Sequence, residues 1–177
     1  YFFDSTPIRR AESLARESEH RFRHMADNAP VMIWMTEVDG TCSYLSKPWY
    51  DFTGQTPSEG LGMGWLEAIH PEDRITAKQT FTAAHEQQVR FRLEYRLRRH
   101  DGIYFWCIDA AAPRFDTDGR YLGYIGSVID ISDRKQAEDT QTLLLSELNH
   151  RVKNTLANVQ AIAQQTLRHT RNPERFV

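Results

Sequence analysis

The sequence predicts an α+β fold: an antiparallel β-sheet with short helices on one face, flanked by an N-terminal helix and a long C-terminal helix. Two observations predict this fold. Asp-Gly pairs at residues 39–40, 101–102 and 118–119 each separate runs rich in aromatic and β-branched residues, as in β-hairpins. Helical patterns occupy both ends of the chain, and the second has no Pro or Gly between Ser132 and Pro173.

The N-terminal helix is predicted over residues 7 to about 28, within a first segment that spans residues 1–28. Its apolar side chains form a narrow stripe among Arg and Glu residues and are Ile8, Ala11, Leu14, Ala15, Phe22, Met25 and Ala26. Pro30 ends the pattern, because proline disfavours a helical conformation in the residue before it. Such a stripe has to pack against the domain that follows or against a second copy of the chain.

The sheet is predicted within residues 29–133. From Val89 to Leu97 the odd positions are apolar and the even positions are Arg or Glu, which indicates a strand with one buried face. The runs 31–35 and 103–108 are apolar on both faces, so we expect part of the outer face of the sheet to be covered as well. Asp-Gly suits the positive φ angles of a type I′ turn, which predicts antiparallel hairpins.

Short helices are predicted between the first two hairpins. The clearest signal is Pro71-Glu72-Asp73, because proline is allowed in a first helical turn and acidic residues there face the positive end of the helix dipole. His70, directly before it, is interpreted as part of this helix start. The segment is therefore expected to place helices across one face of the sheet.

Two strings in this middle region carry a family resemblance. They are residues 65–74, Trp-Leu-Glu-Ala-Ile-His-Pro-Glu-Asp-Arg, and residues 123–135, which run from Gly123 through Asp130-Ile-Ser132-Asp133 to Lys135. The region from about residue 25 to residue 133 resembles a PAS sensor domain, in which the last strand passes into an output helix. The resemblance implies that Asp130, Ser132 and Asp133 form a signal junction.

Aromatic residues of this region could line a ligand cavity, as in some PAS domains, although we expect most of them to fill the core. They are Trp34, Tyr44, Trp49, Phe52, Trp65, Phe81, Phe91 and Trp106. A flavin-adduct photosensor needs a cysteine in the helical region between Tyr50 and Asp73. That region has none, and Cys42 and Cys107 fall on predicted strands, so flavin-adduct photochemistry is not expected.

The C-terminal segment, residues 134–177, is predicted to be one long helix that starts a helical bundle. Asp133 can cap it, with Gln136 three residues later completing the spacing of a capping box. Residues 134–169 would then make a rod of about 50 Å. Asn172-Pro173 is expected to break this helix, and residues 174–177 would begin a return helix.

A heptad pattern runs along this helix. The apolar seam alternates steps of three and four and consists of Leu145, Leu148, Val152, Thr155, Val159, Ile162 and Thr166. With Leu145 at position a, His150 falls at position f and points away from the seam. The pattern predicts a dimeric coiled coil or bundle that keeps His150 in solvent, where its imidazole is available to react.

The string from Glu147 to Ala157, Glu-Leu-Asn-His-Arg-Val-Lys-Asn-Thr-Leu-Ala, carries a second resemblance. It resembles the phosphoacceptor box of sensor histidine kinases and is most similar to the HWE subgroup. The resemblance implies that His150 takes the γ-phosphoryl group of ATP. Arg151 follows the histidine where the commonest kinases have an acid, and the nearest acid on the same face is Glu147. Asn154 can hydrogen-bond the ring or the phosphoryl oxygens, while Arg151 and Lys153 can offset phosphate charge.

The resemblance also implies partners. These are a homodimer formed through the long helix and the N-terminal helix, and a response-regulator receiver domain whose Asp accepts the phosphoryl group. ATP and Mg²⁺ are expected for the full-length enzyme, whereas no cofactor is expected in these residues, which have no Gly-rich nucleotide loop. The ATP-binding domain is expected beyond Val177, so this segment should be inactive alone. Two alternatives stay open: a PAS dimerisation or interaction scaffold, and a phosphotransfer relay without its own kinase.

Composition excludes several classes of protein. Lys and Arg number 22 against 24 Asp and Glu, a formal net charge of −2, which favours neither nucleic acid nor an anionic membrane. No apolar run approaches a membrane span. Two cysteines are too few for a disulfide scaffold, and a cytoplasmic setting is expected. No metal is expected, because His20 and His24 lack a third ligand. His85 is the candidate axial ligand for a haem, as in some PAS domains, but no haem is expected.

Overall fold

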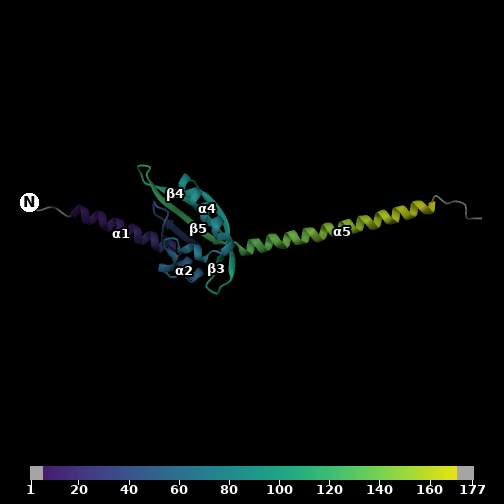
Figure 1. Cartoon of the computed structure of the whole chain (residues 1–177), viewed down its shortest axis with the longest axis horizontal. Helices are drawn as coiled ribbons and strands as arrows, with labels where there is room; N and C mark the ends of the chain where they lie inside the picture. Colours follow the sequence, from purple (N-terminus) through teal and green to yellow (C-terminus); the bar gives the residue numbers. More distant parts are fainter. Residues whose placement is uncertain (1–5, 171–177) are drawn as a thin grey trace, which may run out of the picture. The chain divides into compact units, whose positions relative to one another are not determined.

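The computed structural model describes residues 6–170, with side chains described for residues 9–164. Two compact units divide between Ser132 and Asp133. The first contains α1 (Thr6–Asp27), five strands and four short or medium helices, and the second consists of the long helix α5 (Ser132–Thr170) after its first residue. The predicted α+β architecture, with a helix at each end, is confirmed (Figure 1).

The five strands form one antiparallel sheet. They are β1 (Met32–Thr36), β2 (Cys42–Leu45), β3 (Phe91–Arg98), β4 (Tyr104–Phe115) and β5 (Tyr121–Asp130), in the spatial order β2-β1-β5-β4-β3. The first and last strands along the chain are therefore neighbours, and Trp34 lies opposite Gly126. A Cβ atom at Gly126 would come within 2.3 Å of the Trp34 ring, so only glycine lets the indole lie against the sheet there.

Three hairpins form at the predicted Asp-Gly pairs, but the expected turn type is wrong. In the first, Glu37 N donates to Thr41 O and Gly40 N donates to Glu37 O, which leaves a three-residue loop. The same pair of bonds closes the other two hairpins. Gly40, Gly102 and Gly119 have positive φ, whereas the aspartates before them do not. Each turn is thus a type I turn followed by a left-handed glycine, because the odd loop length excludes the two-residue type I′ turn.

Helices cover the inner face of the sheet. They are α2 (Lys47–Thr53), α3 (Pro57–Gly60), the 3₁₀ helix η1 (Gly64–Ala68) and α4 (Pro71–Gln87) (Figure 1). The predicted start of α4 is confirmed, since Pro71 opens the helix and the His70 side chain accepts a hydrogen bond from Glu72 N. Between this layer and the sheet lies the hydrophobic core, which includes Trp49, Tyr95, Leu97, Tyr124 and Val128.

The outer face of the sheet is covered only in part. At its β2 edge, Phe22 of α1 packs on Tyr44 with ring centroids 5.7 Å apart, and the Tyr44 hydroxyl donates to Asp27 at 2.9 Å. On β4, by contrast, Tyr104 and Trp106 remain 36% and 37% exposed. The stripe on α1 is also largely exposed outside this contact, as at Leu14.

Helix α5 contains 39 residues and is therefore about 58 Å long. It begins one residue before the predicted cap, so Asp133 lies in its first turn rather than at its N-cap. At this N-terminal end of the helix, the Asp130 carboxylate accepts a hydrogen bond from the backbone N–H of Ser132 at 2.8 Å. The predicted break at Asn172-Pro173 and the return helix fall outside the described residues.

Candidate functional site

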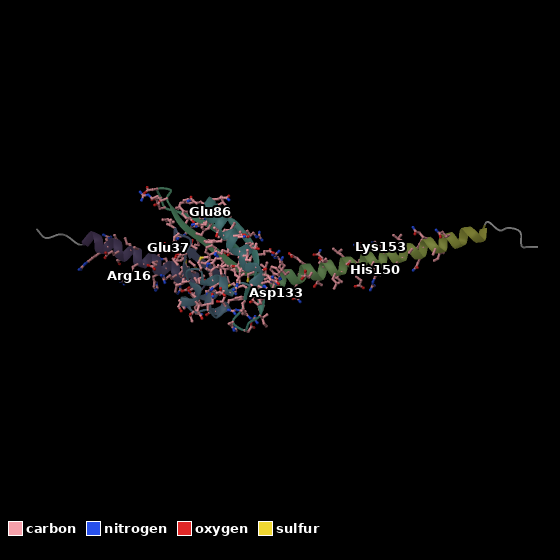
Figure 2. The ribbon with its side chains drawn as sticks, viewed as in Figure 1. Arg16, Glu37, Glu86, Asp133, His150 and Lys153 are labelled. Atoms are coloured by element: carbon pink, nitrogen blue, oxygen red, sulfur yellow. The ribbon has the colours of Figure 1, made fainter. Side chains whose placement is uncertain are left out.

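His150 lies on α5 and is exposed to solvent. At about 100° per residue, its side chain leaves the helix about 140° from Leu145 and about 160° from Val152, so it projects from the side opposite the apolar seam. Figure 2 shows His150 and Lys153 projecting from α5. A rigid helix that holds an imidazole in solvent presents a nucleophile that a second protein can reach.

Two neighbours one helical turn away set the polar surroundings of this ring. Asn154 Nδ2 lies 3.3 Å from His150 Nδ1, the i,i+4 distance expected on one helical face. The Glu147 carboxylate is bound by Arg151 instead, with Nη2 and Oε1 2.5 Å apart. Both members of this ion pair are exposed, so the pair adds little to stability. It keeps one acidic and one basic side chain on the side of the helix that carries His150.

The apolar side chains of the α5 seam are largely exposed in the part of the chain that the structure describes. Leu145, Leu148, Val152, Val159 and Ile162 are each 54% to 63% exposed, and Thr155 is exposed as well. The side chain of Thr166 lies outside the described ones. Removing large aliphatic side chains from water is favourable, and heptad spacing is the pattern by which one helix packs against another. The seam therefore favours association with another helix.

The predicted junction residues lie where the last strand ends. Asp130 closes β5, Ile131 N donates to Trp106 O at 2.8 Å, and the Ser132 hydroxyl accepts from Trp106 N at 3.0 Å. Two bonds to the neighbouring strand β4 thus hold residues 131 and 132 at the sheet. Asp133, the third predicted residue, is the first residue of the second unit.

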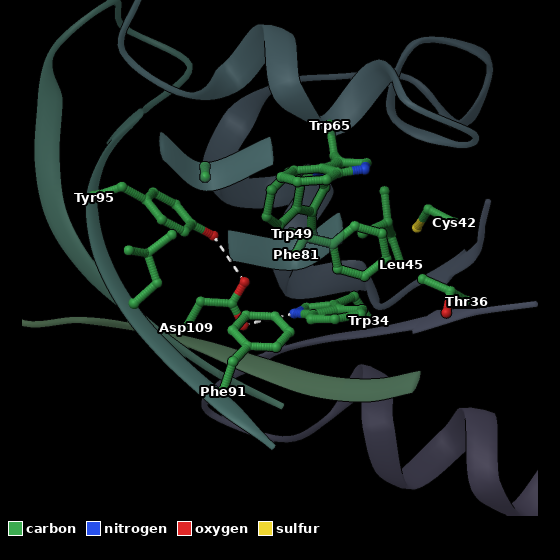
Figure 3. Close-up of a pocket in the computed structure, with 12 residues that line it drawn as sticks. Trp34, Thr36, Cys42, Leu45, Trp49, Trp65, Phe81, Phe91, Tyr95 and Asp109 are labelled. Carbon is green, nitrogen blue, oxygen red and sulfur yellow. Dashed lines mark hydrogen bonds between the residues drawn. The ribbon is translucent and has the colours of Figure 1, made fainter. Parts of the chain in front are cut away.

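A cavity lies inside the first unit, between the sheet and the helices (Figure 3). Five of the eight predicted aromatic residues line it: Trp34, Trp49, Trp65, Phe81 and Phe91. The remaining lining residues are Thr36, Cys42, Leu45, Ala77, Leu93, Tyr95 and Asp109. Its free volume is about 30 Å³, enough for about two water molecules.

Three of the predicted lining residues lie elsewhere. Tyr44 is on the outer face of the sheet, bound to Asp27, because strand alternation turns it away from its inward neighbours. Phe52 packs edge-on against Phe105, and Trp106 lies beneath the Arg96 guanidinium on the outer face of the sheet. Aromatic content alone does not distinguish the two faces of a strand.

Asp109 is the residue that the sequence reasoning missed. Asp109 is 6% exposed, and its carboxylate accepts hydrogen bonds from Trp34 Nε1 at 2.9 Å and from the Tyr95 hydroxyl at 3.3 Å (Figure 3). Burial raises its pKa to about 7, although both hydrogen bonds favour the ionised form. The sequence signal for this site is Asp109 itself, the one acidic residue of the apolar run 105–112. It alternates along the strand with Cys107 and Ala111, which are buried on the inner face.

The other residues considered for cofactors do not gather at this cavity. His85 Nδ1 lies 2.8 Å from the Tyr121 hydroxyl, and its ring stacks on the cavity residue Phe81 without itself lining the cavity. His20 and His24 are exposed on α1. Among the described residues no group of three or more His, Cys, Asp or Glu could hold a metal ion. Within the same part of the chain, no helix has the length and apolar character to cross a bilayer.

Comparison with known proteins gives two family matches. Residues 43–128 match the PAS fold, and residues 147–177 match the HWE histidine kinase family. A crystal structure of a sensory box histidine kinase/response regulator from Burkholderia thailandensis is 26% identical, with a TM-score of 0.54. The alignment covers 73% of this chain and 98% of that one.

Two curated relatives extend the comparison. Protein y4lL of Sinorhizobium fredii, described as uncharacterized, is 44% identical over 76% of this chain and 16% of its own length. A blue-light-activated histidine kinase from Brucella anthropi is 30% identical over 90% of this chain and 32% of its own length. The chain therefore spans about a third or less of these relatives.

Fold and sequence together define a PAS-type sensor domain followed by a histidine-bearing helix. The order of the two family matches along the chain is the order that residues 65–74, 123–135 and 147–157 predict. Residues 43–128 of the chain thus belong to the PAS fold, and residues 147–177 belong to the HWE histidine kinase family.

Proposed function

We propose that this chain is the sensor and phosphoacceptor part of a histidine kinase. His150 accepts the γ-phosphoryl group of ATP and passes it to an aspartate of a response-regulator receiver domain. The observation that carries this proposal is an exposed histidine opposite an apolar seam, inside a segment that matches HWE kinases. ATP and Mg²⁺ would come with a separate nucleotide-binding domain, so residues 1–177 alone are expected to be inactive.

The contact between Asn154 and His150 bears on the nucleophile. The side-chain amide nitrogen of Asn154 can only donate, which would place the neutral ring's proton on Nε2. Rotating the amide by half a turn puts Oδ1 in the same place. Nδ1–H then donates to Asn154, and Nε2 keeps a free lone pair for attack on phosphorus. We assign Asn154 this positioning role, while Arg151 and Lys153 offset the charge of the transferred phosphate.

A labelling experiment tests the assignment of His150. The chain is mixed with the separately purified nucleotide-binding domain of an HWE kinase and with γ-labelled ATP. The unmodified chain is expected to acquire acid-labile phosphate, whereas His150→Gln loses it because glutamine cannot form the phosphoramidate. His20→Gln, an exposed helical histidine, is the matched control and keeps the label. Acid-labile phosphate on the His150→Gln variant would show that the assignment is wrong.

A dimer is part of the proposed function. The seam on α5 supports it, since its aliphatic side chains are more than half exposed in one chain. The α1 stripe is the second proposed contact. We place the protein in the cytoplasm, in keeping with two buried cysteines that form no disulfide.

The sensed signal is proposed to differ from that of a relative named for blue light. The helical region 50–73 has no cysteine, and Cys42, which lines the cavity, has its pKa raised by burial to about 11 and is therefore poorly nucleophilic. The free volume of about 30 Å³ is about a tenth of a typical small-molecule pocket. These residues do not fit flavin-adduct chemistry.

A further inference from the structure

Asp109 places a buried carboxyl group at a cavity that no cationic side chain lines in the described part of the chain. Among its 12 lining residues there is no Lys, Arg or His. Among the described residues, the carboxylate receives hydrogen bonds from two neutral donors, the Trp34 indole and the Tyr95 hydroxyl. A buried carboxylate without a cation is unfavourable, so the group either takes up a proton or pairs with a cation from solution.

The walls of the cavity also select for positive charge. Trp34, Trp65, Phe81, Phe91 and Tyr95 surround the space beside the carboxylate (Figure 3). Their ring faces carry negative potential and attract cations, an attraction that grows when water is excluded. Aromatic faces and a carboxylate oppose an anion, and both favour an ammonium group.

The free volume of the cavity and the oxygen atoms of its lining residues limit the kind of ligand that it can bind. The free volume of about 30 Å³ corresponds to about two non-hydrogen atoms. Thr36, Tyr95 and Asp109 are the lining residues that carry a side-chain oxygen, and the Asp109 carboxylate is the strongest acceptor of N–H groups among them. A metal ion would need more oxygen ligands than these, and its remaining neighbours are hydrocarbon.

We propose that this cavity binds a small primary ammonium ion of about the size of methylammonium, with Asp109 as its counter-charge. The ammonium group donates to the carboxylate, and the methyl group packs against the aromatic rings. This inference concerns the ligand of the sensor domain, and it stands or falls independently of the phosphoacceptor assignment.

Methylammonium chloride is the probe that tests the proposal, added to the chain at constant ionic strength in amine-free buffer. Quenching or shift of tryptophan fluorescence reports binding, since Trp34, Trp49 and Trp65 line the cavity and Trp106 does not. A saturable change is expected at pH 8. Methanol, the neutral molecule of the same size, and potassium chloride are expected to give none. The Trp106→Phe variant should keep the full response.

Asp109→Asn is the informative variant. It keeps the shape and an acceptor for the indole but removes the charge, so the Kd for methylammonium should rise at least about tenfold. Circular dichroism checks its fold. If this variant does not fold, the unmodified chain still decides the question, because a cation needs the ionised carboxylate.

The affinity of the unmodified chain should fall about tenfold between pH 8 and pH 6, as Asp109 becomes protonated around its pKa of about 7. Tyr95 and Cys42, which face the cavity from β3 and β2, have pKa values raised by burial and stay neutral in this range. His85 contacts Phe81 from outside, and His85→Gln should leave the pH profile unchanged. Absence of saturable binding, equal binding of methanol, or a flat pH profile would overturn the proposal.

Discussion

Asp109 shows how much one side chain can depend on its place in the fold. It lies between the alanines and aromatics of β4, where a carboxylate has little access to water. Its two hydrogen-bond donors come from strands β1 and β3, and the indole donor is 75 residues away in sequence. Burial therefore outweighs both hydrogen bonds and leaves the pKa of this carboxyl at about 7 rather than 3.8.

A raised pKa makes stability depend on pH in a defined direction. The native state holds the Asp109 proton more tightly than the unfolded chain does, so this contribution is complete below about pH 4 and is lost as the pH rises to about 7. Relative to the unmodified chain, Asp109→Asn should gain about 2–3 kcal/mol in unfolding free energy between pH 5 and pH 8. Urea unfolding in amine-free buffer at several pH values measures this difference.

Asp101 provides the control for that experiment. Its hydrogen bond from Arg99 lowers its pKa to about 2, so it stays ionised in both states throughout this pH range. Asp101→Asn should therefore shift the unfolding free energy by the same amount at every pH from 5 to 8. Parallel curves for Asp109→Asn and the unmodified chain would contradict the assignment of a buried ionisable carboxyl.

At the level of elements, the sequence patterns predicted the type of each segment more accurately than the turns that connect the segments. Alternation placed the strand that contains Tyr95 and Leu97 with its correct buried face. The Asp-Gly pairs located three hairpins but not their turn type, because the same dipeptide serves two-residue and three-residue loops. The length of the loop depends on which residues of the two strands pair with each other, and the whole sheet determines that register.

The two faces of α5 allow a matched test of its association. Leu148 belongs to the seam and is 58% exposed, whereas Leu143, 69% exposed, projects from the side that carries His150. Leu148→Asp should raise the dimer Kd at least about a hundredfold, or about 2.7 kcal/mol, because two carboxylates would enter an apolar interface. Sedimentation over a range of concentrations measures this constant.

Leu143→Asp introduces the same charge on the same helix and should leave the dimer Kd nearly unchanged. Equal weakening by both variants would mean that the contact surface is not the heptad seam. A chain that stays monomeric at high concentration without any substitution would exclude the dimer altogether.

For the whole molecule, the sequence was sufficient where a motif is contiguous and insufficient where the site is assembled by topology. The residues from Glu147 to Asn154 lie on two turns of one helix, so their spacing alone predicted their shared face. Trp34 on β1, by contrast, meets Asp109 on β4 and Tyr95 on β3 at the cavity because of the order of the strands in the sheet, where β5 and β4 lie between β1 and β3. No local pattern encodes that order of strands.

Regulation can be tested at this scale by changing the length of α5 between Arg134 and Leu143. We expect that a signal in the sensor domain reaches His150 as a change in the rotation or register of this helix, which is continuous from Ser132 to Thr170. One inserted alanine rotates everything beyond it by about 100° about the helix axis, whereas seven inserted residues return it to within about 20°.

In a kinase that contains this chain, the one-residue insertion should therefore change autophosphorylation severalfold and abolish its response to signal. The seven-residue insertion should preserve both, although it lengthens the helix more. Labelling rates with γ-labelled ATP, with and without signal, measure these effects. If regulation survives the single insertion, or if both insertions abolish it equally, the helix acts as a flexible connector and transmission by rotation is wrong.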